Sequence, residues 1–269
     1  MPRWLLSLAL GSGVSLLAYR RRTLTAGGAL AATVVGSVVF GRGGLPAAGA
    51  LLTFFVSSSL LSRWKHAEKQ RRGVLAQAKG GRRDAWQVLA NGGWPAVWIA
   101  SGPRLGGGGF LGGLATAAAD TWATELGLLA RRRPRLVTTG QPVAPGTSGA
   151  VSAEGMLAAC GGALAPGVAW SLLAGNRGAV GLAVVAGLVG SLVDSLLGAT
   201  LQAQFWCEAC QQPTEQIVHS LCGGQTRRVR GVGWIDNDVV NALATLSGSL
   251  LGAAVWRRRR VRWAQDGLR

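Results

Sequence analysis

Two carboxylates and two threonines interrupt an apolar, glycine-rich stretch of the sequence between positions 105 and 130. They are Asp120, Thr121, Thr124 and Glu125. A charge at membrane depth costs about 3 kcal/mol on insertion scales, so such residues are kept mainly where they bind something. Carboxylate oxygens suit Mg²⁺, which usually takes one or two carboxylates together with substrate phosphates. This stretch therefore predicts a polar, metal-assisted phosphate site within a hydrophobic segment.

The spacing of these side chains limits how they can act together. On a helix, residues four apart share a face, which aligns Asp120 with Thr124 and Thr121 with Glu125. Asp120 and Glu125 are about 140° apart around an ideal helix. They can share a ligand if it lies between the two faces. They can also share one if the preceding glycines break the helix and bring the two side chains together. The structural alternative is an ion pair, for which a loop must supply the cation, because these apolar runs contain no basic residue.

A further acid, Asp194, lies in a second apolar run from 190 to 202. Ser191 and Asp194 fall on one helical stripe, and Ser195 and Gln202 fall on a neighbouring one. A polar stripe on a hydrophobic helix faces the bundle interior or a cavity. We therefore expect both runs to contribute to an internal polar site.

The loop 131–152 has the composition of an anion cradle. Four arginines at 131–135 precede the turn Gly146-Thr147-Ser148-Gly149, and Ser152 stands just before an apolar run. Backbone N–H groups at such a turn or helix start bind phosphate, and nearby arginines offset its charge. The Gly-x4-Gly-Lys-Ser/Thr pattern of a P-loop is absent. An ordinary loop with Ser152 as helix N-cap is the structural alternative.

Polar residues four apart open two other apolar runs. Gln87 and Asn91 form one pair, and Asn237 and Asn241 form the other, with Asp238 between them. An acid at a helix start is also explained by capping and the helix dipole. Metal or nucleotide contact and capping both remain open here.

Three cysteines and a histidine form the pattern Cys207-x2-Cys210-x8-His219-x2-Cys222. These are the ligand types and close pairs of a Cys3His zinc site. If the loop faces the cytoplasm, the thiols stay reduced and a disulfide is disfavoured. A structural zinc is therefore one hypothesis for this loop.

Membrane helices must position all these residues. The chain has 269 residues, of which 49% are hydrophobic and 14% charged, with a mean hydropathy of +0.29, as is typical of polytopic membrane proteins. A span needs about 20 residues. We predict an all-α, polytopic integral membrane helical bundle, a single domain over 1–269 with about seven to eight hydrophobic segments. The segments are 4–19, 24–40, 45–61, 85–101, 105–130, 153–174, 179–201 and 239–256.

The net charge of +17 comes from short basic clusters between apolar runs. This is the signature of cytoplasmic loops, which also hold anionic lipid headgroups, and it argues against a nucleic-acid partner. The expected cytoplasmic loops are a basic loop at 63–83 that lies on the membrane surface or in solvent, the loop 131–152, and the Cys/His loop 202–236. The arginines after 256 break this bias, so we expect seven crossings, with the tail beside the site loops.

Five motifs together resemble the transmembrane protein 19-like family, also called domain of unknown function 92. They are Gln87-Val-Leu-Ala-Asn91-Gly, Asp120-Thr-Trp-Ala-Thr-Glu125-Leu-Gly, Pro145-Gly-Thr-Ser-Gly-Ala-Val-Ser152, Gly190-Ser-Leu-Val-Asp194-Ser-Leu-Leu-Gly-Ala-Thr-Leu-Gln202 and Asn237-Asp-Val-Val-Asn241. The resemblance covers nearly the whole chain after the first segment. The family includes the plant chloroplast phytyl-phosphate kinase, which makes phytyl diphosphate from phytyl phosphate and a nucleoside triphosphate, with CTP favoured.

The resemblance implies a membrane-embedded prenyl-monophosphate kinase that uses Mg²⁺ and CTP or another nucleoside triphosphate. Implied catalytic residues are Asp120, Thr121, Glu125 and Asp194, and implied magnesium ligands are Asp120, Glu125, Asp194 and Asp238. Implied substrate and nucleotide contacts are Gln87, Asn91, Thr124, Gly146, Thr147, Ser148, Gly149, Ser152, Ser195, Gln202, Asn237 and Asn241. The attacking group is itself a phosphate, so no strong general base is needed.

A carrier or flippase for a lipid phosphate or a small anion is the main alternative, since it would use similar buried acids and glycine-broken helices. The motif of CDP-alcohol phosphotransferases, Asp-Gly-x2-Ala-Arg followed by Gly-x3-Asp-x3-Asp, is absent. The Arg-, Ala- and Gly-rich sequence without an obvious transit peptide favours a bacterial cytoplasmic membrane. The oligomeric state is left open.

Overall fold

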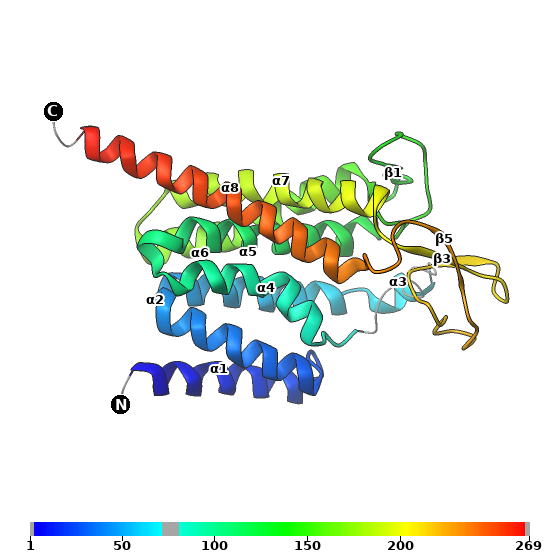
Figure 1. Ribbon diagram of the computed structural model, residues 1–269, viewed down its shortest axis with the longest axis horizontal. Coiled ribbons are helices and arrows are strands. Elements are labelled where there is room, and N and C mark those ends of the chain that lie inside the picture. Colours follow the sequence, from blue (N-terminus) through cyan, green and yellow to red (C-terminus); the bar gives the residue numbers. More distant parts are fainter. Residues whose placement is uncertain (1–2, 72–80, 267–269) are drawn as a thin grey trace.

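The structure is a computed structural model that describes residues 3–71 and 81–266, and long helices running along a common axis dominate it (Figure 1). The bundle helices are α1 (Arg3–Arg20), α2 (Ala26–Arg63), α4 (Ala85–Ala100), α5 (Pro103–Gly127), α6 (Ala153–Ala174), α7 (Gly178–Thr200) and α8 (Asn237–Asp266). A short helix, α3 (His66–Arg71), lies beyond the bundle end. By length and composition, α2, α6, α7 and the part of α8 up to Arg257 can each cross a membrane.

Helix α2 contains two of the expected segments, because it reverses direction at Gly44. This residue has φ 65° and ψ −164°, a backbone conformation that glycine adopts without a steric penalty. The two arms, 26–43 and 45–63, run antiparallel. Arg63 at the end of the second arm donates a hydrogen bond to the carbonyl of Arg21, just before the first arm begins. With the arms counted separately, the described residues form eight lengthwise elements.

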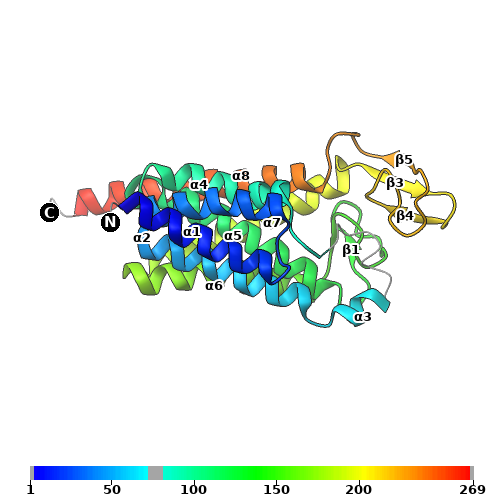
Figure 2. The same ribbon diagram turned by 90° about the horizontal axis from the view of Figure 1, so that it is seen from below.

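The expectation that the tail lies beside the site loops is wrong. The start of α1 and the end of α8 lie at one end of the bundle, and the segments 64–71, 81–84, 128–152 and 201–236 lie around the other (Figures 1 and 2). Helix α8 runs the length of the bundle because it packs closely on α5. A Cβ atom at Gly112 would meet the carbonyl of Gly248, and small residues allow such close approach between membrane helices.

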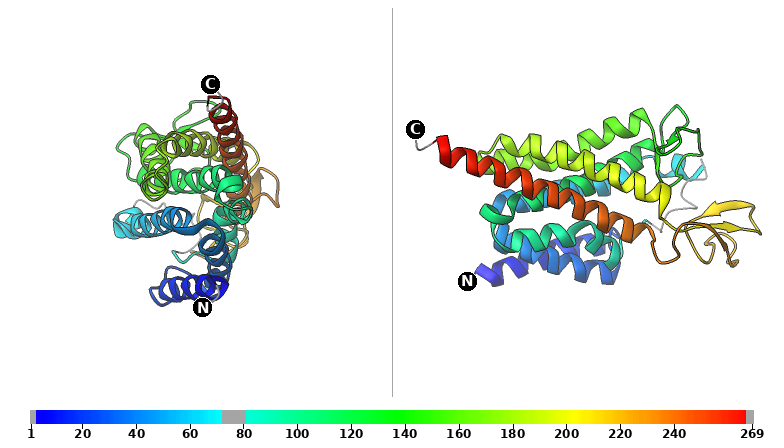
Figure 3. Two further views of the ribbon diagram at one scale, coloured as in Figure 1. Left: turned by 90° about the vertical axis from the view of Figure 1, so that its left-hand side faces the viewer. Right: turned by 45° about the horizontal axis from the view of Figure 1, so that its top comes forward.

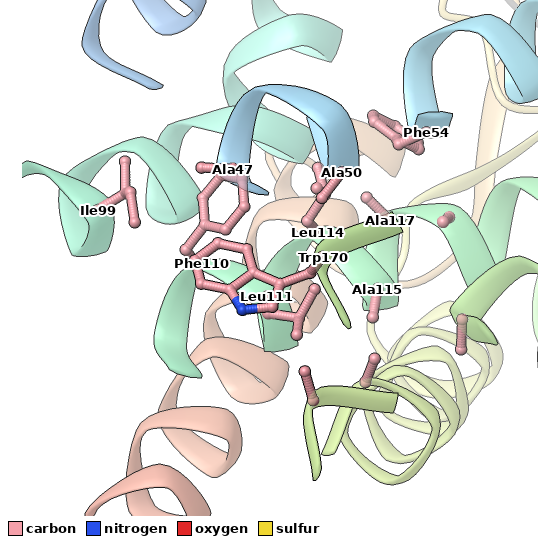
Figure 4. Packing of buried hydrophobic residues seen from close by; sticks show 14 of the residues in the cluster. Ala47, Ala50, Phe54, Ile99, Phe110, Leu111, Leu114, Ala115, Ala117 and Trp170 are labelled. Atoms are coloured by element: carbon pink, nitrogen blue, oxygen red, sulfur yellow. The ribbon is translucent and has the colours of Figure 1, made fainter. Parts of the chain in front are cut away.

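Helix α5 is the centre of the bundle and packs against α2, α4, α6, α7 and α8. Every residue from Gly106 to Ala119 is buried. Phe110, Leu111, Leu114 and Trp170 fill the spaces around it (Figure 4). The end-on view in Figure 3 shows α1, in dark blue, at one edge of the bundle, where it packs on α2. This core fixes the direction in which the polar last turns of α5 point.

Two small antiparallel sheets add to the helices at the loop end (Figure 2). The first pairs β1 (Arg135–Leu136) with β2 (Ala150–Val151). The second has the order β4-β3-β5 and consists of β3 (Gln204–Cys207), β4 (Gln212–Thr214) and β5 (Arg227–Arg230). The all-α prediction thus holds for the bundle. The strands are too short to leave a mark on a hydropathy pattern.

Candidate active site

A cavity of about 1110 Å³ lies at the loop end of the bundle. Its walls are the last turns of α5, α7 and the second arm of α2, the first turns of α4, α6 and α8, and the adjoining loops. Ligand sites usually have volumes of about 300–1,000 Å³. The cavity therefore has room for more than one small molecule.

All sixteen residues expected to act in catalysis or in substrate and nucleotide binding line this one cavity. They are Gln87, Asn91, Asp120, Thr121, Thr124, Glu125, Gly146, Thr147, Ser148, Gly149, Ser152, Asp194, Ser195, Gln202, Asn237 and Asn241. These residues are scattered over more than half of the sequence. Only the packing of four helices and two loops brings them together.

Asp238 is placed differently from the other expected magnesium ligands. It is buried in the first turn of α8 and is not part of the cavity wall, whereas Asn237 and Asn241 are. The preceding acid, Asp236, does line the cavity, and its Oδ1 accepts hydrogen bonds from the N–H groups of Asp238 and Val239, both at 3.0 Å. The structure therefore does not bring Asp238 to a shared metal site, and it supports capping at this helix start.

Asp120 and Asp194 form the acidic part of the cavity. Their carboxylates are close enough to interact electrostatically, and Glu215 acts on Asp194 in the same way. Among the residues whose side chains the structure describes, 4–69 and 81–257, no basic group forms an ion pair with either aspartate, and Oδ2 of Asp194 is buried without a hydrogen-bond partner. Two neighbouring, partly buried carboxylates without a basic partner destabilise the fold unless a cation binds between them. The site therefore fits a hard divalent cation such as Mg²⁺.

Glu125 has a partner from the protein itself. Nζ of Lys69, on α3, forms an ion pair with its Oε2. The Lys69 side chain is fully buried and also donates to the carbonyl of Leu61 at 2.9 Å. Helix α5 is continuous through this region, so Asp120 and Glu125 reach the cavity from flanking faces. For Glu125, the cation expected from a loop in the structural alternative is present.

Positive charge enters the cavity from the segment 63–83, through Arg63 and Arg83, and His66 of the same segment also lines the wall. The arginines of 131–135, expected to offset phosphate charge, are not part of the wall. In that loop, Nη1 of Arg135 donates to the carbonyl of Gly140 at 2.7 Å. Residues of the basic loop 63–83 thus line the cavity, and its residues 72–80 are outside the described part of the chain.

Arg83 is held in place by backbone pairing. Its N–H donates to the carbonyl of Thr23 at 2.9 Å, and its carbonyl accepts from the N–H of Thr25 at 3.0 Å. Burial lowers the pKa of the Arg83 guanidinium, and the charge of Glu125 acts in the opposite direction. An arginine keeps its proton in proteins, so this group is a fixed positive charge.

The Gly146–Gly149 turn lines the cavity as a sharply bent loop. Gly146 and Gly149 have φ of 81° and 78°, and a Cβ atom at Gly149 would meet the backbone of Ala199 in α7. The hydroxyl of Ser148 donates to the carboxylate of Glu215. The turn is therefore locked against α7 on one side and against the loop after β4 on the other.

Two of the expected binding residues also have structural roles. Oγ of Ser152 accepts a hydrogen bond from the N–H of Gly155 at 3.0 Å, which confirms the N-cap interpretation. Gln87 forms a capping box with Asp84 at the start of α4. Both side chains still line the cavity.

The sequence analysis missed several wall residues, notably Arg63, His66, Arg83, Glu215 and Gln216. The basic cluster at 63–83 was visible, but its charge alone could not distinguish a lipid surface from an internal site. Glu215 is a single acid in a polar loop. No pattern in the sequence separates it from an ordinary solvent-exposed residue.

An apolar crevice of about 80 Å³ lies between α1, α2 and α4. Its apolar lining includes Val14, Ala32, Val35, Leu52 and Phe55. Arg83, Gln87 and Asn91 line both this crevice and the polar cavity. The two spaces therefore adjoin at these three residues.

The Cys/His residues gather apart from the cavity. The ligand atoms of Cys207, Cys210, His219 and Cys222 lie within 4.8 Å of one another, and none of these residues is part of the cavity wall. A hydrogen bond from the N–H of Gly224 is the largest cause that lowers the pKa of the Cys222 thiol to about 6. The loop 202–236 thus contains a cluster of thiol and imidazole groups that is separate from the cavity.

A bundle of long apolar helices with a polar cavity at one end has the architecture of a polytopic integral membrane protein. The family model for the integral membrane protein DUF92 matches residues 9–249, and the chain belongs to this family.

Three relatives illustrate the breadth of the family. Protein PGR of Arabidopsis thaliana is 30% identical, over 93% of this chain and 94% of its own length. An uncharacterized membrane protein of Methanocaldococcus jannaschii is 28% identical, over 90% of both chains. Protein VTE6, chloroplastic, of Arabidopsis thaliana is 28% identical, over 85% of this chain and 64% of its own length. No solved structure matches the chain.

Proposed function

We propose that this protein is a membrane-embedded prenyl-monophosphate kinase that transfers a phosphoryl group from CTP or another nucleoside triphosphate to an isoprenoid monophosphate. The observation that carries the proposal is the junction of the apolar crevice with the polar cavity at Arg83, Gln87 and Asn91. A substrate with an isoprenoid tail and a phosphate head needs both environments side by side. The resemblance to the family of the chloroplast phytyl-phosphate kinase supports the same reaction.

The chemistry requires charge control more than a base. A phosphate monoester has a second pKa near 6, so the substrate is largely dianionic near pH 7. One of its oxygens attacks the γ-phosphorus, the bond from that phosphorus to the bridging oxygen breaks, and the nucleoside diphosphate leaves with the electron pair. Positioning and electrostatic stabilisation dominate such transfers. A cavity with only one histidine in its wall is consistent with this requirement.

Different residues of the cavity would bind the two anionic substrates, the nucleoside triphosphate and the prenyl phosphate. Asp120 and Asp194 would hold Mg²⁺, which would offset the charge of the triphosphate. Arg63 and Arg83 counter the repulsion between the two phosphate groups, and Arg83 stands where the lipid phosphate would emerge from the crevice. Backbone N–H groups of the Gly146–Gly149 turn would bind phosphate oxygens, except that of Thr147, which donates to the carbonyl of Ala144.

The cavity end of the bundle is proposed to face the cytoplasm, where nucleoside triphosphates are present. The sequence segments 20–22, 63–83, 131–135 and 202–236 carry 18 of the 28 Lys and Arg residues, and their described parts lie at that end. Such a bias orients membrane proteins with these loops inside. A bacterial cytoplasmic membrane fits this arrangement.

The geometry favours a kinase over a carrier. Carriers commonly bind their substrate near the membrane midplane between discontinuous helices. Helices α5 and α7 are unbroken through the site, and the reversal at Gly44 lies at the opposite end of the bundle. Asp120 lies seven residues before the end of α5, about 10 Å along the helix, so the site opens toward the loop end of the bundle.

The test uses purified full-length protein in detergent or liposomes with Mg²⁺, γ-labelled CTP and phytyl, farnesyl or geranylgeranyl monophosphate. Label in a prenyl diphosphate, present with the control variant Glu208→Gln and absent with Asp120→Asn, would support the proposal. Glu208 is an exposed acid outside the cavity. Folded protein that transfers no label from any nucleotide, but moves a lipid phosphate across proteoliposomes, would replace the kinase with the carrier.

A further inference from the structure

The loop between α7 and α8 contains two turns of the same form. The turn between β3 and β4 carries Cys207 and Cys210, and the turn before β5 carries His219 and Cys222. In each turn the residue directly after the second ligand has a left-handed backbone. Gln211 has φ 51° and Gly223 has φ 68°. The two turns thus present two soft ligand atoms each from matching backbone positions.

The four ligand atoms lie at the spacing of a tetrahedral metal site. Sγ of Cys207 is 3.5 Å from Sγ of Cys222, and Sγ of Cys222 is 3.4 Å from Nδ1 of His219. Tetrahedral zinc with Zn–S bonds of about 2.3 Å places neighbouring sulfurs roughly 3.7 Å apart. The cysteines of the cluster are free thiols and not a disulfide.

The surroundings of the cluster support its ligand atoms. The backbone N–H of Gly224 donates to Sγ of Cys222 at 3.4 Å, and Nε2 of His219 is 3.3 Å from the side-chain amide of Gln212. A metal-bound histidine usually donates its second N–H to an oxygen acceptor, which fixes the ring. A half-turn of the Gln212 amide would bring its oxygen into the position that its Nε2 occupies beside His219. His219 and Cys207 are fully buried, so their polar atoms are withdrawn from water.

We propose that Cys207, Cys210, His219 and Cys222 bind a structural zinc ion. Four protein ligands fill a tetrahedral shell and leave no position for substrate or water, which distinguishes a structural site from a catalytic one. The binding claim rests on this cluster alone and does not depend on the proposed kinase activity.

The Cys/His loop 202–236, with strands β3, β4 and β5, forms a small module. Zinc would stabilise this module, which is too small to form a hydrophobic core of its own. Its strands contain only three or four residues, and sheets of this size bury little apolar surface. Metal binding then contributes directly to folding. The module reaches the cavity through Phe205 and residues 215–218, and Glu215 holds Ser148 of the glycine turn. A zinc ion outside the cavity therefore fixes part of its wall.

The test begins with the metal content of full-length protein purified without chelator, measured by mass spectrometry. About one zinc per chain is expected in the wild type and in the matched control Cys160→Ser, whose cysteine lies in α6. Cys222→Ser and Cys207→Ser should lose it. Cobalt exchanged into the site should give the intense absorption of thiolate ligation in the wild type and in Cys160→Ser only. Zinc-free protein that takes up no cobalt, stoichiometric iron, or a disulfide between Cys207 and Cys222 would each overturn the proposal.

A second measurement keeps the structural role testable if the cysteine variants fold poorly. Wild-type protein treated with a zinc chelator should become sensitive to limited proteolysis within 204–230, while the bundle stays intact, and added zinc should restore protection. Cleavage that is unchanged after complete removal of the metal would refute the structural role.

Discussion

Glu125 and Asp120 lie five residues apart on the same helix, yet their surroundings in the cavity differ. Glu125 is neutralised by Lys69, whose buried side chain is brought in by a short helix from another part of the chain. Asp120 instead lies near Asp194, and no described basic residue pairs with either of them. The comparison indicates that one acid holds the wall together, whereas the other two are available for an added cation.

The largest effect should come from the unpaired acids. Asp120→Asn or Asp194→Asn removes a ligand from the proposed magnesium site, and we expect a fall in kcat of about 1,000-fold, equivalent to about 4 kcal/mol. The thermal unfolding temperature in detergent should not fall, because the change relieves repulsion between carboxylates. Phosphoryl transfer and thermal unfolding measured on the same preparations check both statements. An active Asp120→Asn protein would show that Asp120 is not a ligand of the proposed magnesium ion.

Breaking the ion pair of Glu125 with Lys69 should instead lower the stability of the protein. Lys69→Met leaves Glu125 without its partner in a largely buried position, which typically costs about 3–5 kcal/mol of stability. The unfolding temperature should drop clearly, and Glu125→Gln added to Lys69→Met should recover much of the loss. A double-mutant cycle of unfolding free energies measures this coupling. If Glu125→Gln alone abolished transfer as Asp120→Asn does, Glu125 would belong with the metal ligands.

The apolar crevice, unlike the acidic cavity, should affect the binding of the substrate tail. Ala32→Phe fills part of the crevice between α1, α2 and α4. We expect KM for geranylgeranyl monophosphate to rise about tenfold, a size consistent with 1–3 kcal/mol for overfilling an apolar space, and to rise less for shorter tails. The control Ala254→Phe places the same ring on an exposed position of α8. Equal changes for all tail lengths would argue against a tail site.

The smallest effect is expected at the glycine turn. Ser148→Ala removes the hydrogen bond to Glu215 but leaves the backbone of the turn unchanged. One hydrogen bond contributes about 1 kcal/mol, so kcat/KM for the nucleotide should fall only about fivefold. Ser101→Ala, at the opposite end of the bundle, is the matched control. A loss as large as that of Asp120→Asn would give the Ser148 hydroxyl a direct role.

Much of this arrangement could be predicted because membrane helices obey simple rules. Hydropathy marks the segments, including the break at Gly44, and polar residues inside them point to the cavity that Asp120, Asp194 and Asn241 line. The partner of Glu125 could not be predicted in the same way. Lys69 is one of eight basic residues between 63 and 83, and only the packing of α3 selects it.

The side on which the tail lies also escaped prediction, because counting arginines cannot reveal how tightly α8 packs on α5. The wall residue Glu215 and the strands of the Cys/His loop depend on contacts between distant segments, and such contacts leave no periodic pattern. The sequence therefore predicts helices and their polar faces well, and it predicts the loops that complete the site poorly.

The connections at the end of the bundle away from the cavity are very short, with Gly44 alone, residues 101–102 and residues 175–177 each joining two long helices. Three helical hairpins can therefore enter the membrane as units, each with its backbone hydrogen bonds already formed. Asp120 and Asp194 belong to different hairpins, so the acidic cluster exists only after these have docked. A ligand that binds both acids would act as a clamp on assembly, and its presence during biogenesis would raise the yield of correctly folded protein.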